Sequence, residues 1–134
     1  MTALVDIEGI GETYAAKLKT VGATTVEKLL ELGSTPKGRK DLAEKSGISD
    51  TLLLKWINHC DLIRVKGVAG EYSELLEAAG VDTVPELAQR KPENLLAKMQ
   101  EVNAAKKLVR SLPAVSQVTD WVEQAKKLPR IINY

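Results

Sequence analysis

The feature that most constrains this chain is an internal repeat. Residues 7–29 align without a gap with residues 65–87. The identical pairs include the glycines and the apolar positions: Gly9/Gly67, Tyr14/Tyr72, Leu18/Leu76, Gly22/Gly80, Thr25/Thr83, Val26/Val84 and Leu29/Leu87. Self-similarity at a fixed interval is typical of a supersecondary unit that is present more than once. We therefore expect two copies of one folding unit.

Each copy carries the start and stop signals of helices. Gly9 and Gly11 permit backbone conformations that a side chain would resist, which predicts a sharp turn. A helix is expected to follow and to stop at Gly22, a residue suited to the left-handed position after a helix. Thr24 or Thr25 can then cap the next helix. The second copy has matching signals at Gly67, Gly70, Gly80, and Asp82 or Thr83.

Similar signals predict further helices in each half. In the first half they cover about residues 36–46 and 50–62, after caps at Thr35 and Ser49. In the second half one helix starts at Pro92, a separate one covers 104–112 and is broken by Pro113, and a last one follows Ser116 and ends near Pro129. The expected fold is all-α, with two pseudo-repeated bundles, residues 1–63 and 64–134, packed together.

The composition limits the partners of such a fold. The net charge is only +1, whereas a chain that binds DNA through its overall charge is usually clearly basic. Any nucleic-acid site must therefore be a local patch. No apolar run approaches the roughly 20 residues that span a bilayer, and the first residues do not resemble a signal peptide. We expect a cytoplasmic protein that does not enter a membrane.

The first repeated turn has a chemistry of its own. Amides of a glycine turn, together with the positive end of the following helix, can bind a phosphate without a cationic side chain. The segment Ile7-Glu8-Gly9-Ile10-Gly11-Glu12-Thr13-Tyr14-Ala15-Ala16-Lys17-Leu18 resembles the helix-hairpin-helix motif of DNA repair and replication proteins. Nearly the whole chain also resembles a bacterial family called domain of unknown function 4332. That resemblance implies tandem helix-hairpin-helix folding and no established activity.

The broader motif implies which residues would contact nucleic acid. In its DNA-binding members the hairpin backbone holds phosphates without reading bases. Transferred to this chain, the first set is Gly9, Ile10, Gly11 and Thr13, with Lys17 one turn further on. The second set is Lys66, Gly67, Val68 and Gly70. A separate basic cluster, Lys37, Arg39 and Lys40, could add phosphate contacts from a helix N-terminus.

The chain departs from the motif at both turns. Glu8 and Glu12 flank the first turn, where a carboxylate would repel a phosphate. In the second turn Ala69 replaces the second glycine, and Gly70 could restore flexibility through a shifted turn. The alternative interpretation is that both hairpins are structural corners only.

A helix-turn-helix reader is another hypothesis for residues 39–56. Gly47 would be its turn, and the second helix would offer Asp50, Thr51, Lys55, Asn58 and His59 to a DNA groove. The same pattern also describes two short helices that pack across a glycine, without any contact to DNA.

No motif indicates catalysis, a cofactor, a metal or a small-molecule substrate. The single histidine and the single cysteine, His59 and Cys60, are adjacent, and neighbouring helical positions point about 100° apart. We expect a non-enzymatic protein that binds DNA weakly and without sequence preference. The competing hypothesis is a scaffold that binds a protein partner, motivated by the balanced charge and the Leu-rich helices.

Overall fold

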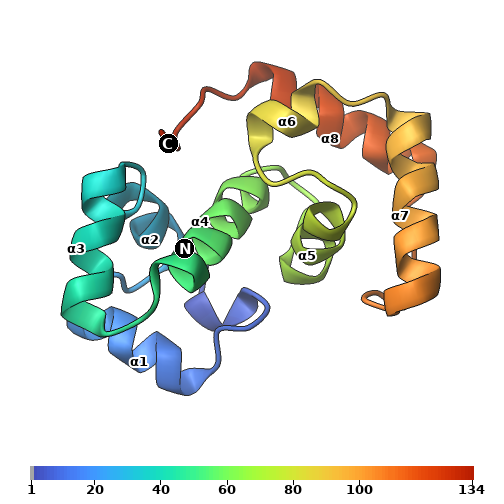
Figure 1. Ribbon diagram of the computed structural model, residues 1–134. Helices are drawn as coiled ribbons and strands as arrows, with labels where there is room; N and C mark the ends of the chain where they lie inside the picture. Colours follow the sequence, from blue (N-terminus) through green and yellow to red (C-terminus); the bar gives the residue numbers. More distant parts are fainter. Residues whose placement is uncertain (1) are drawn as a thin grey trace. The chain divides into compact units, whose positions relative to one another are not determined.

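The computed structural model describes residues 2–134, and its regular elements over that range are all helices (Figure 1). The predicted all-α fold class is confirmed. The chain divides into two compact units, Met1–Asp61 with Arg130–Tyr134, and Leu62–Pro129. None of the helices described is both long and apolar enough to cross a lipid bilayer.

Unit 1 contains the elements of the first half of the chain. In order they are the short 3₁₀ helix η1 (Leu4–Asp6), α1 (Glu12–Thr20), α2 (Val26–Leu32), α3 (Pro36–Ser46) and most of α4 (Asp50–Ile63). Side chains cap three of these helices as predicted, because Thr25 accepts from the Lys28 amide at 3.1 Å, Thr35 from the Gly38 amide at 3.0 Å and Ser49 from the Leu52 amide at 3.2 Å. Gly47 ends α3 in the left-handed conformation, with φ at 76°.

The core of unit 1 is aliphatic around one tryptophan. Its fully buried side chains include Ile7, Leu18, Leu29, Leu53, Trp56 and Ile57. Burial of each such side chain contributes about 1.5–3 kcal/mol to folding. Gly38 lets α3 approach the end of α2 closely, because a Cβ there would overlap the carbonyl oxygen of Leu32. This glycine of the basic cluster therefore has a packing role.

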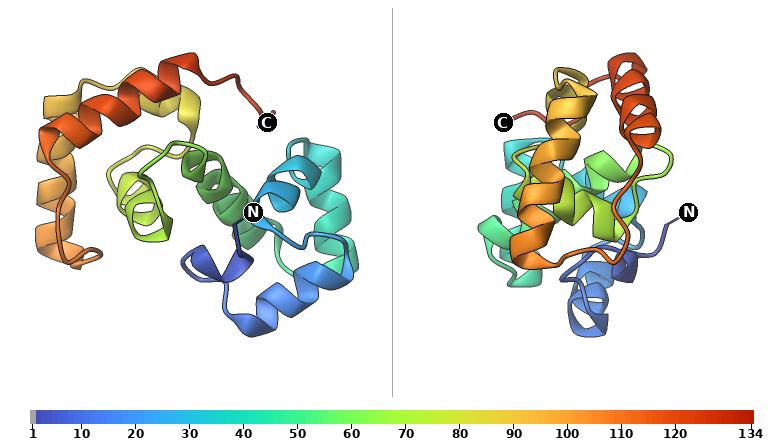
Figure 2. Two further views of the ribbon diagram at one scale, coloured as in Figure 1. Left: turned by 180° about the vertical axis from the view of Figure 1, so that it is seen from behind. Right: turned by 90° about the vertical axis from the view of Figure 1, so that its right-hand side faces the viewer.

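Unit 2 contains the elements of the second half of the chain. Its helices are α5 (Gly70–Ala78), α6 (Val84–Ala88), α7 (Pro92–Lys106) and α8 (Val115–Lys127). Figure 2 shows α8 beside α6 and across one end of α7, and α8 contacts both helices. Buried Leu75, Leu76, Leu87, Leu95 and Trp121 belong to one apolar cluster.

The separate helix predicted for residues 104–112 is wrong. Helix α7 continues to Lys106 and ends at Lys107, which takes a left-handed conformation with φ at 52°. The side-chain amide of Asn103 binds both the N–H and the C=O of Val109, at 3.0 and 3.2 Å. These bonds hold the next residues outside a helix, which periodicity alone did not indicate.

The start of the last helix is also shifted from its prediction. Helix α8 begins at Val115 rather than after Ser116. The side chain of Gln117 accepts a hydrogen bond from the Ala114 amide at 2.8 Å, and so stabilises the N-terminal end of α8 without a serine cap.

Candidate nucleic-acid interface

The two repeated turns have the same backbone conformation, each within its own unit. Gly9 and Gly67 have φ values of 93° and 97°, a region that L side chains rarely adopt. After each glycine an amide donates to the carbonyl three residues earlier. Ile10 donates to Ile7 and Val68 donates to Val65, both at 3.1 Å. A glycine is therefore required at the first position of each turn, as predicted.

A tryptophan lies close to the glycine of each turn, which the sequence did not predict. A Cβ built on Gly9 would lie 3.3 Å from Nε1 of Trp56, and one on Gly67 would lie 2.8 Å from Nε1 of Trp121. Each indole also packs against a repeated tyrosine, Tyr14 on Trp56 with ring centroids 5.0 Å apart and Tyr72 on Trp121 at 5.3 Å. The placement of the two tryptophans late in each half was the only sequence signal of this contact.

The second glycine of the first turn is different. Gly11 has φ −84° and ψ −177°, an extended conformation that any residue can adopt, and Ala69 at the matching position has φ −105° and ψ −173°. No atom of residues 2–134, chain neighbours aside, lies within 4 Å of a Cβ built on Gly11. The expectation that Gly11 serves the backbone is wrong, and the space above this residue is open.

Three predicted site residues have structural roles. Ile10 and Val68 are 3% and 4% exposed, so their side chains are core anchors, and their amides bond within the turns. Gly70 is buried as the first residue of α5. The turn is not shifted towards Gly70, because Ala69 keeps the conformation of Gly11.

The remaining residues of the first set surround the N-terminus of α1. Gly9, Gly11, Thr13 and Lys17 are exposed. In the described chain no side chain caps this helix, so the first amides have no partner from the helix itself. The Lys17 ammonium lies 5.7 Å from the centre of the Tyr14 ring.

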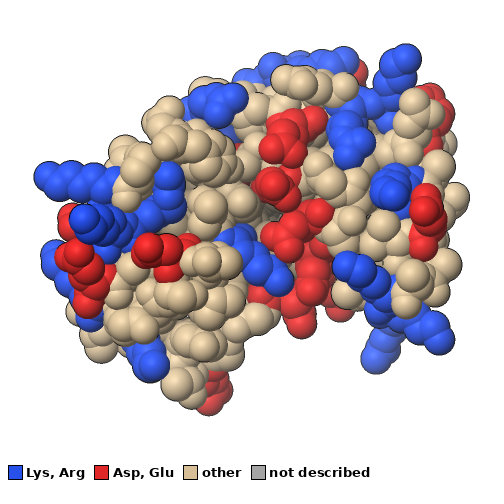
Figure 3. All heavy atoms as spheres, in the orientation of Figure 1, with Lys and Arg blue, Asp and Glu red and all other residues tan. Residues whose placement is uncertain are grey.

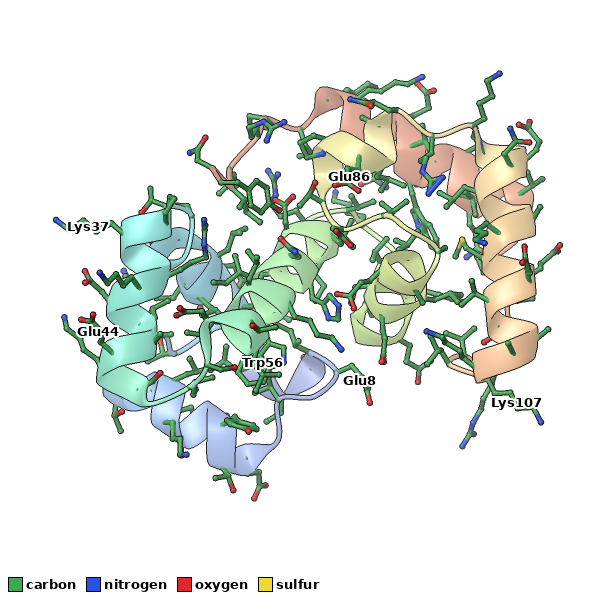
Figure 4. The ribbon with its side chains drawn as sticks, in the orientation of Figure 1. Glu8, Lys37, Glu44, Trp56, Glu86 and Lys107 are labelled. Atoms are coloured by element: carbon green, nitrogen blue, oxygen red, sulfur yellow. The ribbon has the colours of Figure 1, made fainter. Side chains whose placement is uncertain are left out.

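Two carboxylates share this surface with Lys17. Glu8 lies next to Gly9 and extends away from the ribbon into solvent (Figure 4). Glu12 is the first residue of α1 and is exposed as well. A carboxylate at this position is favourable for the helix, because it interacts with the positive end of the helix dipole. Among the described residues, the N-terminus of α1 therefore has no side-chain cap, and its positive charge is partly neutralised.

The second turn is bound by a side chain of its own unit. Gln124 on α8 accepts from the Lys66 amide at 2.9 Å and donates to the Lys66 carbonyl at 3.0 Å. It also donates to Asp120 at 2.8 Å. The Lys66 side chain is exposed, but the amide and carbonyl groups of the same residue are hydrogen-bonded to α8.

The basic cluster lies on α3, away from the first turn. Figures 1 and 2 show α3 running from the end of α1 to a far end, and Lys37 is labelled at that far end in Figure 4. Lys37 and Lys40 are exposed. Over α3 blue and red side chains alternate in Figure 3, so the surface is mixed in charge. Unit 1 therefore does not bring this cluster to the turn.

Arg39 is occupied within unit 1. Its guanidinium donates to the Gly33 carbonyl and to the Asn133 carbonyl, both at 2.9 Å. It also lies over the Tyr134 ring, 5.6 Å from the centre. The prediction that Arg39 contacts phosphate is therefore not supported by its geometry. A hollow of about 270 Å³ beside it is lined by Pro36, Arg39, Lys40, Asp50 and Leu54, so an acidic group borders it too.

Two residues of the helix-turn-helix hypothesis are inside the protein. Asn58 is 8% exposed and His59 is fully buried, and Asn58 accepts a hydrogen bond from the Tyr134 hydroxyl at 2.8 Å. Side chains in this position cannot reach base edges in a major groove. That hypothesis is therefore wrong for the far part of α4, although Gly47 does form the turn between α3 and α4.

Cys60 is not an activated nucleophile. The residue is 1% exposed. Burial raises the pKa of its thiol well above the usual range, and the carboxylates of Glu27 and Asp61 act in the same direction. Since the thiolate is the reactive form, this cysteine stays protonated and inert at neutral pH.

Comparison with known proteins connects this architecture to one family. The family model described as a domain of unknown function (DUF4332) matches residues 8–128. Curated proteins and solved structures give no match. The matched range begins at the first turn and includes all the helices from α1 to α8. The chain belongs to the DUF4332 family.

Proposed function

We propose that this protein is a non-catalytic helix-hairpin-helix protein that binds nucleic-acid phosphates without reading bases. The binding surface is the turn Gly9-Ile10-Gly11 with the N-terminus of α1, and Thr13 and Lys17 border it. Amides at a helix N-terminus bind phosphate oxygens through hydrogen bonds and the helix dipole. Both interactions are independent of base sequence.

The open position above Gly11 supports this proposal most strongly. The backbone does not need glycine there, because Ala69 adopts a similar conformation in the second turn. The packing does not need it either, since only open space surrounds a Cβ at this position in residues 2–134. A glycine that its own fold does not require is expected where another molecule approaches the backbone closely.

The acidic residues beside the turn limit the expected affinity for DNA. Glu8 and Glu12 are exposed at either side of Gly11 and would repel a phosphate. We therefore expect weak binding, with a dissociation constant on the order of 10⁻⁵ to 10⁻⁴ M at low salt, in the range of non-specific DNA binding. Glu8→Gln and Glu12→Gln are each expected to tighten it.

The test exchanges the residues that distinguish the two turns. Binding of labelled duplex and single-stranded DNA is measured by fluorescence anisotropy at low salt. Gly11→Ala is expected to weaken binding about tenfold, the equivalent of one charge-assisted hydrogen bond. Ala69→Gly is the matched control in the second turn and is expected to leave the affinity unchanged.

Salt and sequence dependence complete this experiment. Binding through phosphates weakens steeply as salt rises and varies little between DNA sequences. No binding at several hundred micromolar protein would overturn the proposal, as would a Gly11→Ala variant that binds like the wild type while circular dichroism shows an unchanged helix content.

A second candidate function is protein–protein interaction, with the hairpins as structural corners. The two hydrogen bonds between Gln124 and the Lys66 backbone favour it for the second turn, because they use that turn inside unit 2. It predicts a defined complex that Gly11→Ala does not affect. Sedimentation measurements on the wild type and on this variant test it, and a strictly monomeric chain at all concentrations would contradict self-association.

A further inference from the structure

Residues Arg130–Tyr134 return to unit 1 as an extended peptide. We call residues Arg130–Tyr134 the tail segment; none of them lies in a helix. Its Asn133 amide donates to the Ser34 carbonyl at 2.8 Å, and its Asn133 carbonyl accepts from Arg39 at 2.9 Å. Both peptide groups of this residue are thus engaged by unit 1.

Side chains of the tail segment add three further contacts. Ile132 is 2% exposed and supplies an apolar anchor. The Tyr134 ring lies against the Arg39 guanidinium at 5.6 Å, and its hydroxyl donates to Asn58 at 2.8 Å. We call Ser34, Arg39 and Asn58 the tail-docking surface. It combines backbone pairing with side-chain selection, as surfaces that recognise extended peptides do.

Few residues hold the tail segment in place. A short stretch of backbone connects it to unit 2. Arg64 in unit 2 donates to the Pro129 carbonyl at 2.9 Å, whereas Arg39 in unit 1 holds the Asn133 carbonyl. Residues 130–132 lie between these two arginine contacts. A change of backbone direction in this short stretch would release the tail segment without loss of any helix.

We propose that the tail-docking surface also accepts the tail segment of a second copy of this chain, so that two chains exchange tails. The surface already fits this peptide, and an exchanged tail makes the same contacts in the dimer as in the monomer. Exchange of an identical element is a low-cost route to a dimer because no new interface has to be designed. The inference specifies the partner in the second candidate function and is independent of DNA binding.

The tail segment of each chain competes with that of a second copy for the docking surface. This competition sets the concentration at which tail-exchanged dimers form. A tethered segment meets its own docking surface at an effective concentration in the millimolar range. The wild type is therefore expected to be monomeric in the micromolar range and to form dimers near 1 mM. Removal of the tethered competition should lower this threshold strongly.

Two complementary variants remove that competition. The surface variant, Arg39→Leu, keeps an intact tail segment but loses two contacts to it. The tail variant, Ile132→Asp with Tyr134→Ala, keeps an intact docking surface but cannot fill it. Each docks its own tail segment less tightly than the wild type does, so an equimolar mixture at about 0.2 mM is expected to contain a 1:1 heterodimer in sedimentation. Each variant alone is expected to stay monomeric.

Matched controls show that the docking surface is responsible. Lys37→Leu removes a positive charge from the same helix but leaves the tail contacts, so it should pair with the tail variant at least about tenfold more weakly. Arg39→Lys keeps the charge and loses the planar fork, and Tyr134→Ala alone changes a residue that is 62% exposed. These milder variants replace the first two if circular dichroism shows lost helix.

The outcomes decide the proposal. A heterodimer in the complementary mixture, absent from each variant alone, supports tail exchange. Only monomers in that mixture overturn it, as does equal pairing by Lys37→Leu. Either negative result leaves the anisotropy test of DNA binding unaffected.

Discussion

The two glycine turns show which parts of a duplicated motif are required by the fold. At the first glycine both copies agree, with φ values of 93° and 97° and a tryptophan over each residue. At the second glycine they differ, because Ala69 takes the place of Gly11 with the backbone almost unchanged. The fold therefore requires glycine at the first position of the turn, whereas it accepts glycine or alanine at the second.

The surroundings of the turns differ as well. The second turn is held by Gln124 and carries Lys66, whereas the first carries Glu8 and leads into α1, whose N-terminus no side chain of residues 2–134 caps. The turn with the better local charge is therefore the one whose peptide groups are partly occupied. Charge alone would select the second turn for phosphate binding, and backbone access selects the first.

The largest expected effect tests whether the two tryptophans are equivalent. Trp56 and Trp121 are 1% and 2% exposed and each covers a glycine. Trp56→Ala and Trp121→Ala are each expected to lower the free energy of unfolding by about 3–5 kcal/mol, because both leave a large cavity. Urea unfolding followed by circular dichroism measures both. A loss below about 1 kcal/mol for one of them would break the equivalence.

The next effect separates the positive-φ glycines of the two turns, Gly9 and Gly67. Gly9→Ala is expected to cost about 1–2 kcal/mol for a left-handed alanine. Gly67→Ala should cost more, about 2–4 kcal/mol, because its Cβ would lie 2.8 Å from the Trp121 nitrogen, against 3.3 Å at the first turn. The same urea titration ranks them, and the reverse order would contradict the tighter packing of the second turn.

The Gln124→Ala variant tests how much the hydrogen bonds from Gln124 stabilise the second turn. This change removes both hydrogen bonds to the Lys66 backbone and is expected to lower the unfolding free energy by about 1 kcal/mol, because water can replace part of the loss. Amide hydrogen exchange should become faster at Lys66 and not at Glu8. Gln100→Ala, an exposed change on α7, is the control. An unchanged rate of hydrogen exchange at the Lys66 amide would show that the hydrogen bonds from Gln124 do not stabilise this turn in solution.

The smallest effect concerns a contact that only unit 1 has. Both oxygens of Glu27 accept from the Thr2 amide, at 3.0 and 3.1 Å, while the second copy has Pro85 at the matching position. Partial burial acts to raise the pKa of Glu27, but hydrogen bonds from the Glu27 and Thr2 amides outweigh it, so the pKa is lowered from 4.5.

A lowered carboxyl pKa gives a defined pH dependence. Below the unfolded-state value the unfolded chain binds more protons than the native one, so the stabilisation is present above about pH 4.5 and is lost as pH falls through the lower native pKa. From about pH 6 to about pH 3 the wild type should lose more stability than Glu27→Gln, by a small amount since the group is exposed. Equal losses in urea titrations would exclude this contribution.

Local signals in the sequence predicted much of the fold. The caps at Thr25 and Thr35, the start of α7 at Pro92 and the left-handed Gly47 depend on residues within one turn of a helix, and each was confirmed. The repeat likewise identified the positive-φ glycine of each turn, Gly9 and Gly67, because the two residues have the same backbone conformation.

Long-range contacts explain what was missed. Arg39 was assigned to phosphate because of its basic neighbours, yet its partner Asn133 is 94 positions away. Gly11 was assigned to the backbone because it is a glycine, although its conformation does not need one. The helix expected for 104–112 failed because the Asn103 side chain holds Val109, a contact that helical periodicity does not encode.

The return of the chain to unit 1 at Arg130 has a consequence for synthesis. Ser34 and Arg39 leave the ribosome long before Asn133, which lies 94 residues after Arg39. At about 5–20 residues per second, unit 1 waits about 5–20 s for its last contacts. During that interval all of unit 2 is made and can fold, so the first unit to begin folding is the last to be completed.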